Sequence, residues 1–455
     1  MNIKDKYIEF FESKNHTFLE PASLLPNDNT TLFTSAGIQQ LVPYMISGEE
    51  HTTGNRLVNY QKCLRLTDIE AIGDSYHHTF FEMLGNWSMN NYFKNETIEM
   101  SYEFLVKKLN MDPNKLAVTV FKGDENISKD EEAIEKWKSL GIPEERIACL
   151  GYEDNWWPSV HDDGPCGTDT EIFYWRSDNP VPEIFDPNDD RWVEIWNNVF
   201  VQFNRIGGNN LVKLDKKYID TGMGVERMTS ILEGLNDNYK SELFKPIINV
   251  IEKHSNQKYN ETTNQKYMRI IADHIRAIVM ICSDDKTIIP SNKDRGYILK
   301  RLMRRMMISA YKLEINDFEK LSSELITTVI EQLKDYYPYI TTEQKRIETL
   351  INSENKKFSK IITTGEKRIN KALEVLKEND LNKMDSKIIF RLYETYGVPL
   401  DLTYTILNEN NVSYDTKEVD CLLKLHKIES KKSAEQKFKN KEEKQQKVRE
   451  LTRTL

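Results

Sequence analysis

The stretch 219–227, Ile-Asp-Thr-Gly-Met-Gly-Val-Glu-Arg, combines residue types that suit a charged ligand. Gly222 and Gly224 lack a Cβ, so we expect them to open a turn at which backbone amides can approach an anion closely. Arg227 lies in the first turn of the helix expected over 222–234 and adds a permanently charged guanidinium. The string predicts a phosphate-binding turn, although glycines before a helix are also ordinary turn chemistry, so other motifs must decide between the two interpretations.

A second set of candidate residues lies on two expected strands, 56–65 and 76–89, joined by a short loop. Alternation along the second strand assigns one set of side chains to each face: His77, Thr79, Phe81 and Met83 to one, His78, Phe80, Glu82 and Leu84 to the other. A nucleobase stacked on Phe81 with a phosphate at Arg65 would suit this arrangement. The alternative is a half-buried strand whose aromatic rings only fill the core.

Carboxylates and amides on two further strands complete the chemistry-bearing residues. Asp169 and Glu171 follow the turn at 164–167 and could hold a magnesium ion or a ligand hydroxyl. Asn197 interrupts a strongly apolar strand over 193–203, where a buried amide needs hydrogen-bond partners. A ligand in a central cleft would supply those partners, and so would ordinary core hydrogen bonding.

These residues belong to a region of mixed strands and helices, which changes to helices alone near 236–238. The pattern therefore predicts an α+β domain over 1–237 and an all-helical domain over 238–455. Further expected elements of the first domain are helices 2–14, 95–109 and 131–140, short strands 31–34 and 116–121, a loop-rich stretch over 151–187, and a hairpin at 207–208. Expected helices of the second are 244–252, 267–281, 297–313, 318–333, 342–378 and 387–396, and the Lys/Glu-rich tail 427–455 is expected to be a solvated helix or a frayed end.

Composition limits the class of protein. The 455 residues are 30% charged with a net charge of -9, and no apolar run approaches the ~20 residues that cross a bilayer. The N-terminus has no signal-peptide pattern, and the five cysteines are scattered without metal-ligand spacing. We therefore expect a cytoplasmic protein without a membrane partner or a zinc site. Basic residues concentrate over 293–312, a stripe that could attract nucleic-acid phosphates.

Several of these strings together resemble the class II alanyl-tRNA synthetases. The matching strings, in order, are HHTFFEMLGNW (77–87), GPCG with TEIFY (164–174), EIWNNVFVQFNR (194–205), IDTGMGVER (219–227) and FRLYETYGVPLDLT (390–403). The likeness runs from the first helix to about residue 425. It implies an antiparallel sheet of six strands flanked by helices, and an enzyme that activates alanine with ATP and Mg²⁺ and charges tRNA(Ala).

The resemblance assigns roles to the candidate residues. Arg65 matches the arginine that holds the α-phosphate, Arg227 the one that contacts the γ-phosphate and covers the adenine, and Phe81 the aromatic ring on the other side of the base. Met83 and Gly224 complete the implied ATP site. Asp220 matches the carboxylate that receives the alanine ammonium, and the small amino-acid pocket would be lined by Trp157 (or, alternatively, Trp156), Asn197, Val199 and Gly222.

The helical half would then recognise the tRNA acceptor stem. Asn292 matches the asparagine that reads a G·U wobble pair, and its acidic partner near the Tyr-Gly-x-Pro string would be Asp401 or Glu394. Arg301, Arg304 and Arg305, in the basic stripe, would contact acceptor-stem phosphates.

The chain departs from the family pattern after Arg65, where the sequence Leu-Thr-Asp-Ile-Glu replaces a longer loop that carries a lysine in many relatives. The matching strings include no editing region and no C-terminal oligomerisation region of the family. We therefore expect a monomer that does not clear mischarged tRNA. Two rival hypotheses remain: a paralogue that activates another small amino acid for a different carrier, and a tRNA-binding module that has lost catalysis.

Overall fold

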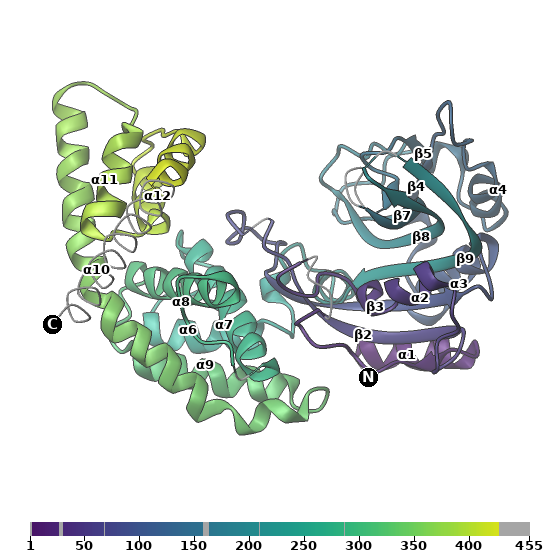
Figure 1. Cartoon of the computed structure of the whole chain (residues 1–455), viewed down its shortest axis with the longest axis horizontal. Helices are drawn as coiled ribbons and strands as arrows, with labels where there is room; N and C mark the ends of the chain where they lie inside the picture. Colours follow the sequence, from purple (N-terminus) through teal and green to yellow (C-terminus); the bar gives the residue numbers. More distant parts are fainter. Residues whose placement is uncertain are drawn as a thin grey trace, which may run out of the picture. The chain divides into compact units, whose positions relative to one another are not determined.

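The computed structural model describes residues 2–26, 31–67, 69–157, 163–208, 210–285 and 287–426. The chain forms two compact units, Met1–Ile351 and Asn352–Leu455 (Figure 1). The domain boundary expected at 237/238 stays a prediction, and the tail 427–455 lies outside the described residues. Among the helices of the described ranges, none is long and apolar enough to span a membrane.

The described residues of the first unit form a sheet of nine strands in the order β1-β2-β3-β9-β8-β7-β4-β5, with β6 paired to β7. The six strands from β2 to β4 in this order pair antiparallel throughout, as expected, while β1 and β5 add parallel pairs at the two ends. The strands are β1 (Thr17–Phe18), β2 (Arg56–Leu64), β3 (Phe80–Met89), β4 (Leu116–Phe121), β5 (Ile147–Leu150), β6 (Trp156–Trp157), β7 (Gly164–Trp175), β8 (Trp192–Ile206) and β9 (Asn210–Gly224).

Helices cover one face of this sheet. Side chains that alternate along the strands, among them Leu84, Trp196 and Phe200, join the apolar faces of the helices in one buried cluster. The helices that contribute are α1 (Ile3–Ser13), α3 (Lys94–Glu103), α4 (Glu131–Ser139) and α5 (Val225–Leu232). The intervening residues of the same strands therefore face the opposite side, where α2 (Val42–Ser47) covers part of the sheet.

One buried ion pair crosses this core. Lys4 on α1 is 2% exposed, and its Nζ lies 2.8 Å from Oε1 of Glu82, which is fully buried on β3. The ammonium also lies 3.4 Å from the ring centroid of Tyr336, and Tyr337 donates its hydroxyl to Glu82 at 2.9 Å. The pair fastens the N-terminal helix to strand β3 of the sheet.

Replacing Lys4 by methionine should lower the free energy of unfolding by about 3 kcal/mol, because the carboxylate of Glu82 would lose its buried counter-charge. Chemical denaturation of both proteins at neutral pH measures the difference. Adding Glu82→Gln to the Lys4→Met variant should recover part of the loss, since a neutral amide costs less to bury than an unpaired carboxylate. A single variant as stable as the wild type would show that the pair contributes nothing.

Helices follow the sheet, as the periodicity indicates. The first unit contains α6 (Lys245–Ser255), α7 (Gln265–Asp284), α8 (Asp294–Lys312) and α9 (Phe318–Leu333). Most of α7 is buried, and this helix packs on both α8 and α9. The long helix α10 (Gln344–Glu378) begins in the first unit and continues into the second, which also holds α11 (Ser386–Tyr396) and α12 (Leu400–Glu409).

Five expected elements differ from the structure, and one of them, the expected strand 76–89, begins only at Phe80. Residues 31–34 form no strand, and the expected helix 95–109 changes to a π-helical turn at Phe104. The stretch 151–187 contains the twelve-residue strand β7 within a region expected to be mainly loop. The expected turn at 219–224 is the end of strand β9, and α5 begins only at Val225.

Candidate active site

A cavity of about 400 Å³ opens on the face of the sheet that the helical core leaves free. Its walls come from the β2–β3 connection, from strands β3, β6, β7, β8 and β9, and from the first turn of α5. The lining includes all ten residues that the sequence assigned to an ATP site or an amino-acid pocket: Arg65, Phe81, Met83, Trp157, Asn197, Val199, Asp220, Gly222, Gly224 and Arg227. The structure thus brings these residues together, while the role of each stays a prediction.

Strand register explains why residues so far apart in the chain meet here. Val199 on β8 lies opposite Asp169 on β7 and opposite Asp220 on β9. Two residues earlier on β8, Asn197 lies between Glu171 and Gly222 in the same way. Because side chains two residues apart share a face of a sheet, the two rows present their polar groups to one side.

Gly222 and Gly224 lie on strand β9 and do not form a turn. Neither Gly222 nor Gly224 has a positive φ, and φ of Gly224 is -72°. A Cβ at Gly222 would lie 3.1 Å from Sδ of Met83 on the neighbouring strand. The turn expected in the stretch 219–227 is therefore wrong, because pairing of β9 with β8 and β3 keeps the first part of the stretch extended. Binding of a phosphate by this stretch stays a prediction.

Asp220 is a buried carboxylic acid that lines the cavity. Its side chain is 7% exposed, and Oδ1 accepts a hydrogen bond of 2.7 Å from Nε1 of Trp87. Burial raises the pKa of Asp220 to about 7, against the lowering effects of Trp87 and of the Thr221 backbone. A cationic group placed beside this carboxylate would favour its charged form.

Two further carboxylates, Asp169 and Glu171, lie on β7, which strand β8 separates from Asp220 on β9. Burial raises the pKa of Asp169 to about 7, while Asn155 donates to its Oδ1 at 2.9 Å. Burial, followed by the nearby charge of Glu194, raises the pKa of Glu171 to about 9. Glu171 and Glu194 line the cavity, so a cation bound there would relieve their mutual repulsion.

Raised pKa values make the ligand-free protein less stable as the pH increases. A folded-state pKa above the unfolded one gives stability that is present at low pH and is lost as the pH rises toward the folded value. For Glu171 this window runs from the ordinary 4.5 to about 9. The free energy of unfolding should fall between pH 7 and 9, by at most about 1.4 kcal/mol per pH unit for one proton.

Denaturation of the ligand-free protein at pH 7, 8 and 9 measures this slope. Glu171→Gln carries no titrating proton and should show a shallower dependence than the wild type. Equal slopes in the two proteins would contradict the assignment of the proton to Glu171.

Two arginines line the same cavity. The guanidinium of Arg65 lies 5.1 Å from the ring centroid of Phe81, and its Nε donates to the Ser35 carbonyl at 3.1 Å. Nη1 of Arg227 donates to the carbonyl of Glu194 at 2.6 Å and lies 3.2 Å from its Oε2. Each arginine is thus oriented by one residue, Arg65 by Ser35 and Arg227 by Glu194, and lines the cavity with a permanent positive charge.

Several lining residues were not predicted. Tyr76, His77 and His78 belong to the segment before β3, where the expected alternation fails because the strand begins only at Phe80. Nδ1 of His77 lies 2.5 Å from Oδ2 of Asp74, a contact of the turn that periodicity does not reveal. The remaining unpredicted members of the lining are Ala36, Glu194 and Glu226.

The neighbouring tryptophans take separate positions. Trp157 lines the cavity, whereas the ring of Trp156 packs among Phe121, Tyr152 and Phe203. The structure therefore favours Trp157, the first of the two alternatives, as the pocket residue.

The predicted tRNA-binding residues lie on the helices of both units. Asn292 precedes α8, and its Oδ1 accepts from Nζ of Lys300 at 2.7 Å. On α8, Arg301 forms an ion pair with Glu70, and Arg305 is only 9% exposed. Arg304 also lies on α8, while Glu394 on α11 and Asp401 on α12 belong to the second unit. Their contacts with tRNA stay predictions.

Comparison with known proteins connects this site to a family. The family model for tRNA synthetases class II (A) matches residues 2–454. An alanine–tRNA ligase of Borrelia hermsii (strain HS1 / DAH) is 41% identical over 443 residues, which are 96% of this chain and 74% of that protein. An alanine–tRNA ligase of Treponema denticola is 42% identical over 444 residues, which are 96% of this chain and 73% of that protein.

A solved structure gives only a weak match: the apo histidyl-tRNA synthetase of S. aureus covers 52% of this chain and 69% of its own, at 13% identity and a TM-score of 0.31. The sequence matches, in contrast, extend over almost the whole chain. With its cavity on an antiparallel sheet and its helical continuation, the chain belongs to the class II tRNA synthetases, in the alanine (A) family.

Proposed function

We propose that this chain is an alanine–tRNA ligase, which forms alanyl-adenylate from alanine and ATP and transfers the alanyl group to the 3′ end of tRNA(Ala). One observation carries the proposal: a single cavity is lined by a buried acid suited to an ammonium group and by two arginines suited to phosphates. Relatives named alanine–tRNA ligase, about 40% identical over 96% of the chain, support the choice of amino acid.

Asp220 would bind the amino group of alanine. The charge of the ammonium lowers the free energy of the ionised carboxylate, which burial alone disfavours. Trp157, Val199 and Gly222 surround the space next to it and would leave room for a methyl side chain. Shape limits larger amino acids in such a pocket, whereas serine differs by a single hydroxyl and is rejected only about a hundredfold by pockets of this kind.

Phe81 and the two arginines of the lining would bind ATP. Phe81 offers a face on which the adenine can stack, Arg65 would hold the α-phosphate, and Arg227 the γ-phosphate. His77, held by Asp74 at 2.5 Å, adds a nitrogen to the same wall that can donate to a phosphate oxygen when it carries the proton.

Adenylate formation needs cations and orientation more than a general base. A carboxylate oxygen of alanine attacks the α-phosphorus, and pyrophosphate leaves with the electrons of the broken P–O bond. Two anions must approach each other, so Arg65 and Arg227 would offset their repulsion while Asp220 fixes the direction of attack.

Magnesium would bind together with ATP in this cavity. In the described part of the chain no three His, Cys, Asp or Glu side chains are grouped to hold a metal ion by themselves. Glu171 and Glu194, however, are two carboxylates of the lining, and Mg²⁺ typically takes one or two carboxylates and completes its shell with phosphate and water. The ion would screen the phosphate charges. A chain without zinc is what the sequence predicts, and that prediction stands untested.

The second step would use the helical half. The terminal ribose hydroxyl of the tRNA attacks the alanyl carbonyl and loses its proton, and AMP leaves. Asn292 would contact the G·U pair of the acceptor stem, with Glu394 or Asp401 as the acidic partner. The basic residues of α8 would contact the phosphate backbone.

Replacing Asn292 by alanine should leave alanine-dependent pyrophosphate exchange within about twofold, because the residue lies outside the cavity, and should reduce charging of tRNA(Ala) by about 10- to 100-fold, the cost of one base contact. Charging with labelled alanine of tRNA(Ala) that carries the G·U pair, or a G·C pair in its place, measures the effect.

The wild type should charge the G·U form and fail with the G·C form, and the variant should lose this preference. Equal charging of both tRNAs by the wild type would contradict recognition of the acceptor stem as proposed.

A further inference from the structure

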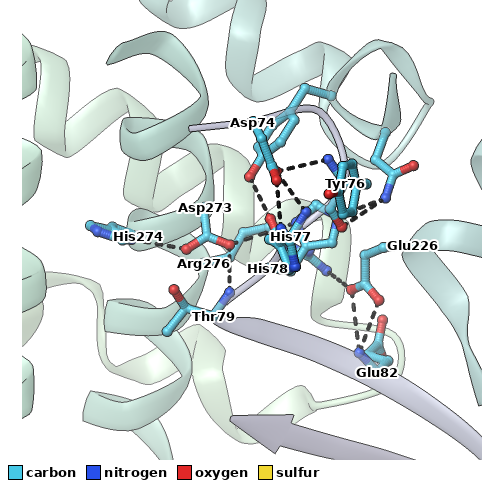
Figure 2. A network of polar contacts seen from close by, with 12 residues as sticks. Asp74, Tyr76, His77, His78, Thr79, Glu82, Glu226, Asp273, His274 and Arg276 are labelled. Carbon is cyan, nitrogen blue, oxygen red and sulfur yellow. Dashed lines mark hydrogen bonds and ion pairs between the residues drawn. The ribbon is translucent and has the colours of Figure 1, made fainter. Parts of the chain in front are cut away.

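Helix α7 touches the catalytic half through a buried carboxylate. Asp273 is 1% exposed, and its Oδ1 accepts the backbone N–H of Thr79 at 2.8 Å. The carbonyl of Thr79 in turn accepts the backbone N–H of Arg65 at 3.0 Å. Two hydrogen bonds therefore connect the helical half to the arginine of the candidate ATP site, and Figure 2 shows the contacts of Asp273 with His274 and with Thr79.

The carboxylate is held in its charged form by two histidines. Nδ1 of His274 lies 2.9 Å from Oδ2 of Asp273, and Nδ1 of His78 lies 3.6 Å from Oδ1. Nε2 of His274 accepts from Nε of Arg305 at 3.1 Å, so the proton of this imidazole belongs on Nδ1 and is donated to Asp273. Burial alone would raise the pKa of Asp273, but the hydrogen bond from His274 and the nearby imidazole of His78 outweigh it and hold the pKa well below its usual range.

The same helices fix the connection between β2 and β3 at further points. Nη2 of Arg305 donates to the carbonyl of Ile69 at 3.0 Å, and Nη1 of Arg305 lies 3.0 Å from Oε2 of Glu70. On α7, Nη1 of Arg269 donates to the carbonyl of Gly73 at 3.1 Å. The connection is thus attached near its beginning, middle and end, and its last residues form a wall of the cavity.

We propose that Asp273 and His274 are positioning residues for ATP, which act through Thr79 and set the place of the Arg65 backbone. This inference rests on the proposed adenylate chemistry. Neither residue lines the cavity, and both are almost completely buried, so neither binds a ligand itself. The helical half would then contribute to amino-acid activation, a role separate from any contact with tRNA.

The expected consequence is a selective loss on the ATP side. Displacing a catalytic group by about 1 Å can cost about 100-fold in rate. Arg65 and Phe81 follow the anchored backbone, whereas Asp220, Asn197 and Val199 are held by the pairing of β7, β8 and β9, which the change does not touch.

The test compares Asp273→Asn with the wild type in the full chain. Pyrophosphate exchange should show a KM for ATP raised about tenfold and a KM for alanine within twofold, and calorimetry without alanine should show ATP binding weakened by a similar factor. Asp130→Asn is the matched control, because Asp130 is also buried with a cation, Lys94, at 2.6 Å, but lies outside the cavity lining. That variant should keep both KM values.

A second pair of variants protects the test against misfolding. His274→Asn can keep a donor near the place of Nδ1 and should retain more ATP affinity than His274→Ala, which has none. Equal changes of the two KM values in Asp273→Asn, or unchanged ATP affinity in that variant and in His274→Ala, would overturn the inference.

Failure of the inference can be separated from failure of the proposed function. A wild type that exchanges pyrophosphate with alanine, beside an Asp273→Asn variant with normal ATP kinetics, would remove only the positioning role. A wild type without exchange would remove the proposed function, and calorimetric ATP binding would still decide whether Asp273 positions the site.

Discussion

Asp220→Asn should reduce kcat/KM for alanine by about 100- to 1000-fold and change the KM for ATP by less than about threefold, because loss of one partner of a buried charge pair costs about 3–4 kcal/mol. The asparagine oxygen can still accept the hydrogen bond from Trp87, so the structural contact of the side chain survives. Only the negative charge opposite the substrate ammonium is removed. Pyrophosphate exchange over a range of alanine concentrations measures the loss.

Asp169→Asn is the matched control for this variant. Asp169 is equally buried and lies in the same row of the sheet, separated from Asp220 by Val199, but it does not line the cavity. Asp169→Asn should lower kcat/KM for alanine by less than about tenfold, because Asp169 acts only through neighbouring amides. Unchanged alanine kinetics in Asp220→Asn, or equal losses in the two variants, would refute the role of Asp220.

Arg65→Ala should lower the maximal exchange rate by about 1000-fold, which corresponds to about 4 kcal/mol, because removing one preorganised donor of a charged transition state costs about that much. Arg65→Lys should recover only part of this rate, since an ammonium cannot offer the planar fork. The KM for alanine should change less than the rate, because the variant leaves Asp220 and the pocket residues of β8 and β9 in place. Exchange at saturating alanine and ATP isolates the effect.

Arg56→Lys provides the control on the same strand. Arg56 begins β2, pairs with Glu96 at 2.7 Å and lies outside the cavity lining, whereas Arg65 directly follows the end of β2. The control variant should exchange at the wild-type rate. If the Arg65→Ala variant exchanged pyrophosphate at nearly the wild-type rate, Arg65 would not be the residue that holds the α-phosphate.

Much of the fold could be predicted because each element has a local pattern. Period-2 alternation on β3 correctly put Phe81 and Met83 on one face and Phe80, Glu82 and Leu84 on the other. Helical periodicity found α6 to α11 within a few residues. The motif strings also brought together residues whose contacts depend on the pairing of β7, β8 and β9, which no local pattern contains.

The errors have physical reasons of the same kind. Gly222 and Gly224 looked like a turn because a single strand does not reveal its partners, and glycine can serve close packing as well as positive φ. His77 and His78 were assigned to opposite faces of a strand that begins only at Phe80. Arg305 was expected in a basic stripe that contacts phosphates; its hydrogen bond to the β2–β3 connection is a long-range contact that charge spacing cannot show, and its contact with tRNA stays a prediction.

The most direct test of alanine–tRNA ligase activity is exchange of labelled pyrophosphate into ATP by the purified wild type with each small amino acid in turn. We expect that alanine supports exchange, that serine and glycine support it less well per unit concentration, and that omitting the amino acid abolishes it. Exchange that prefers glycine, serine or a non-protein amino acid over alanine would contradict the proposed function and indicate a ligase that loads a different carrier. Normal binding of tRNA with no exchange at all would also contradict it and indicate a tRNA-binding module without catalysis.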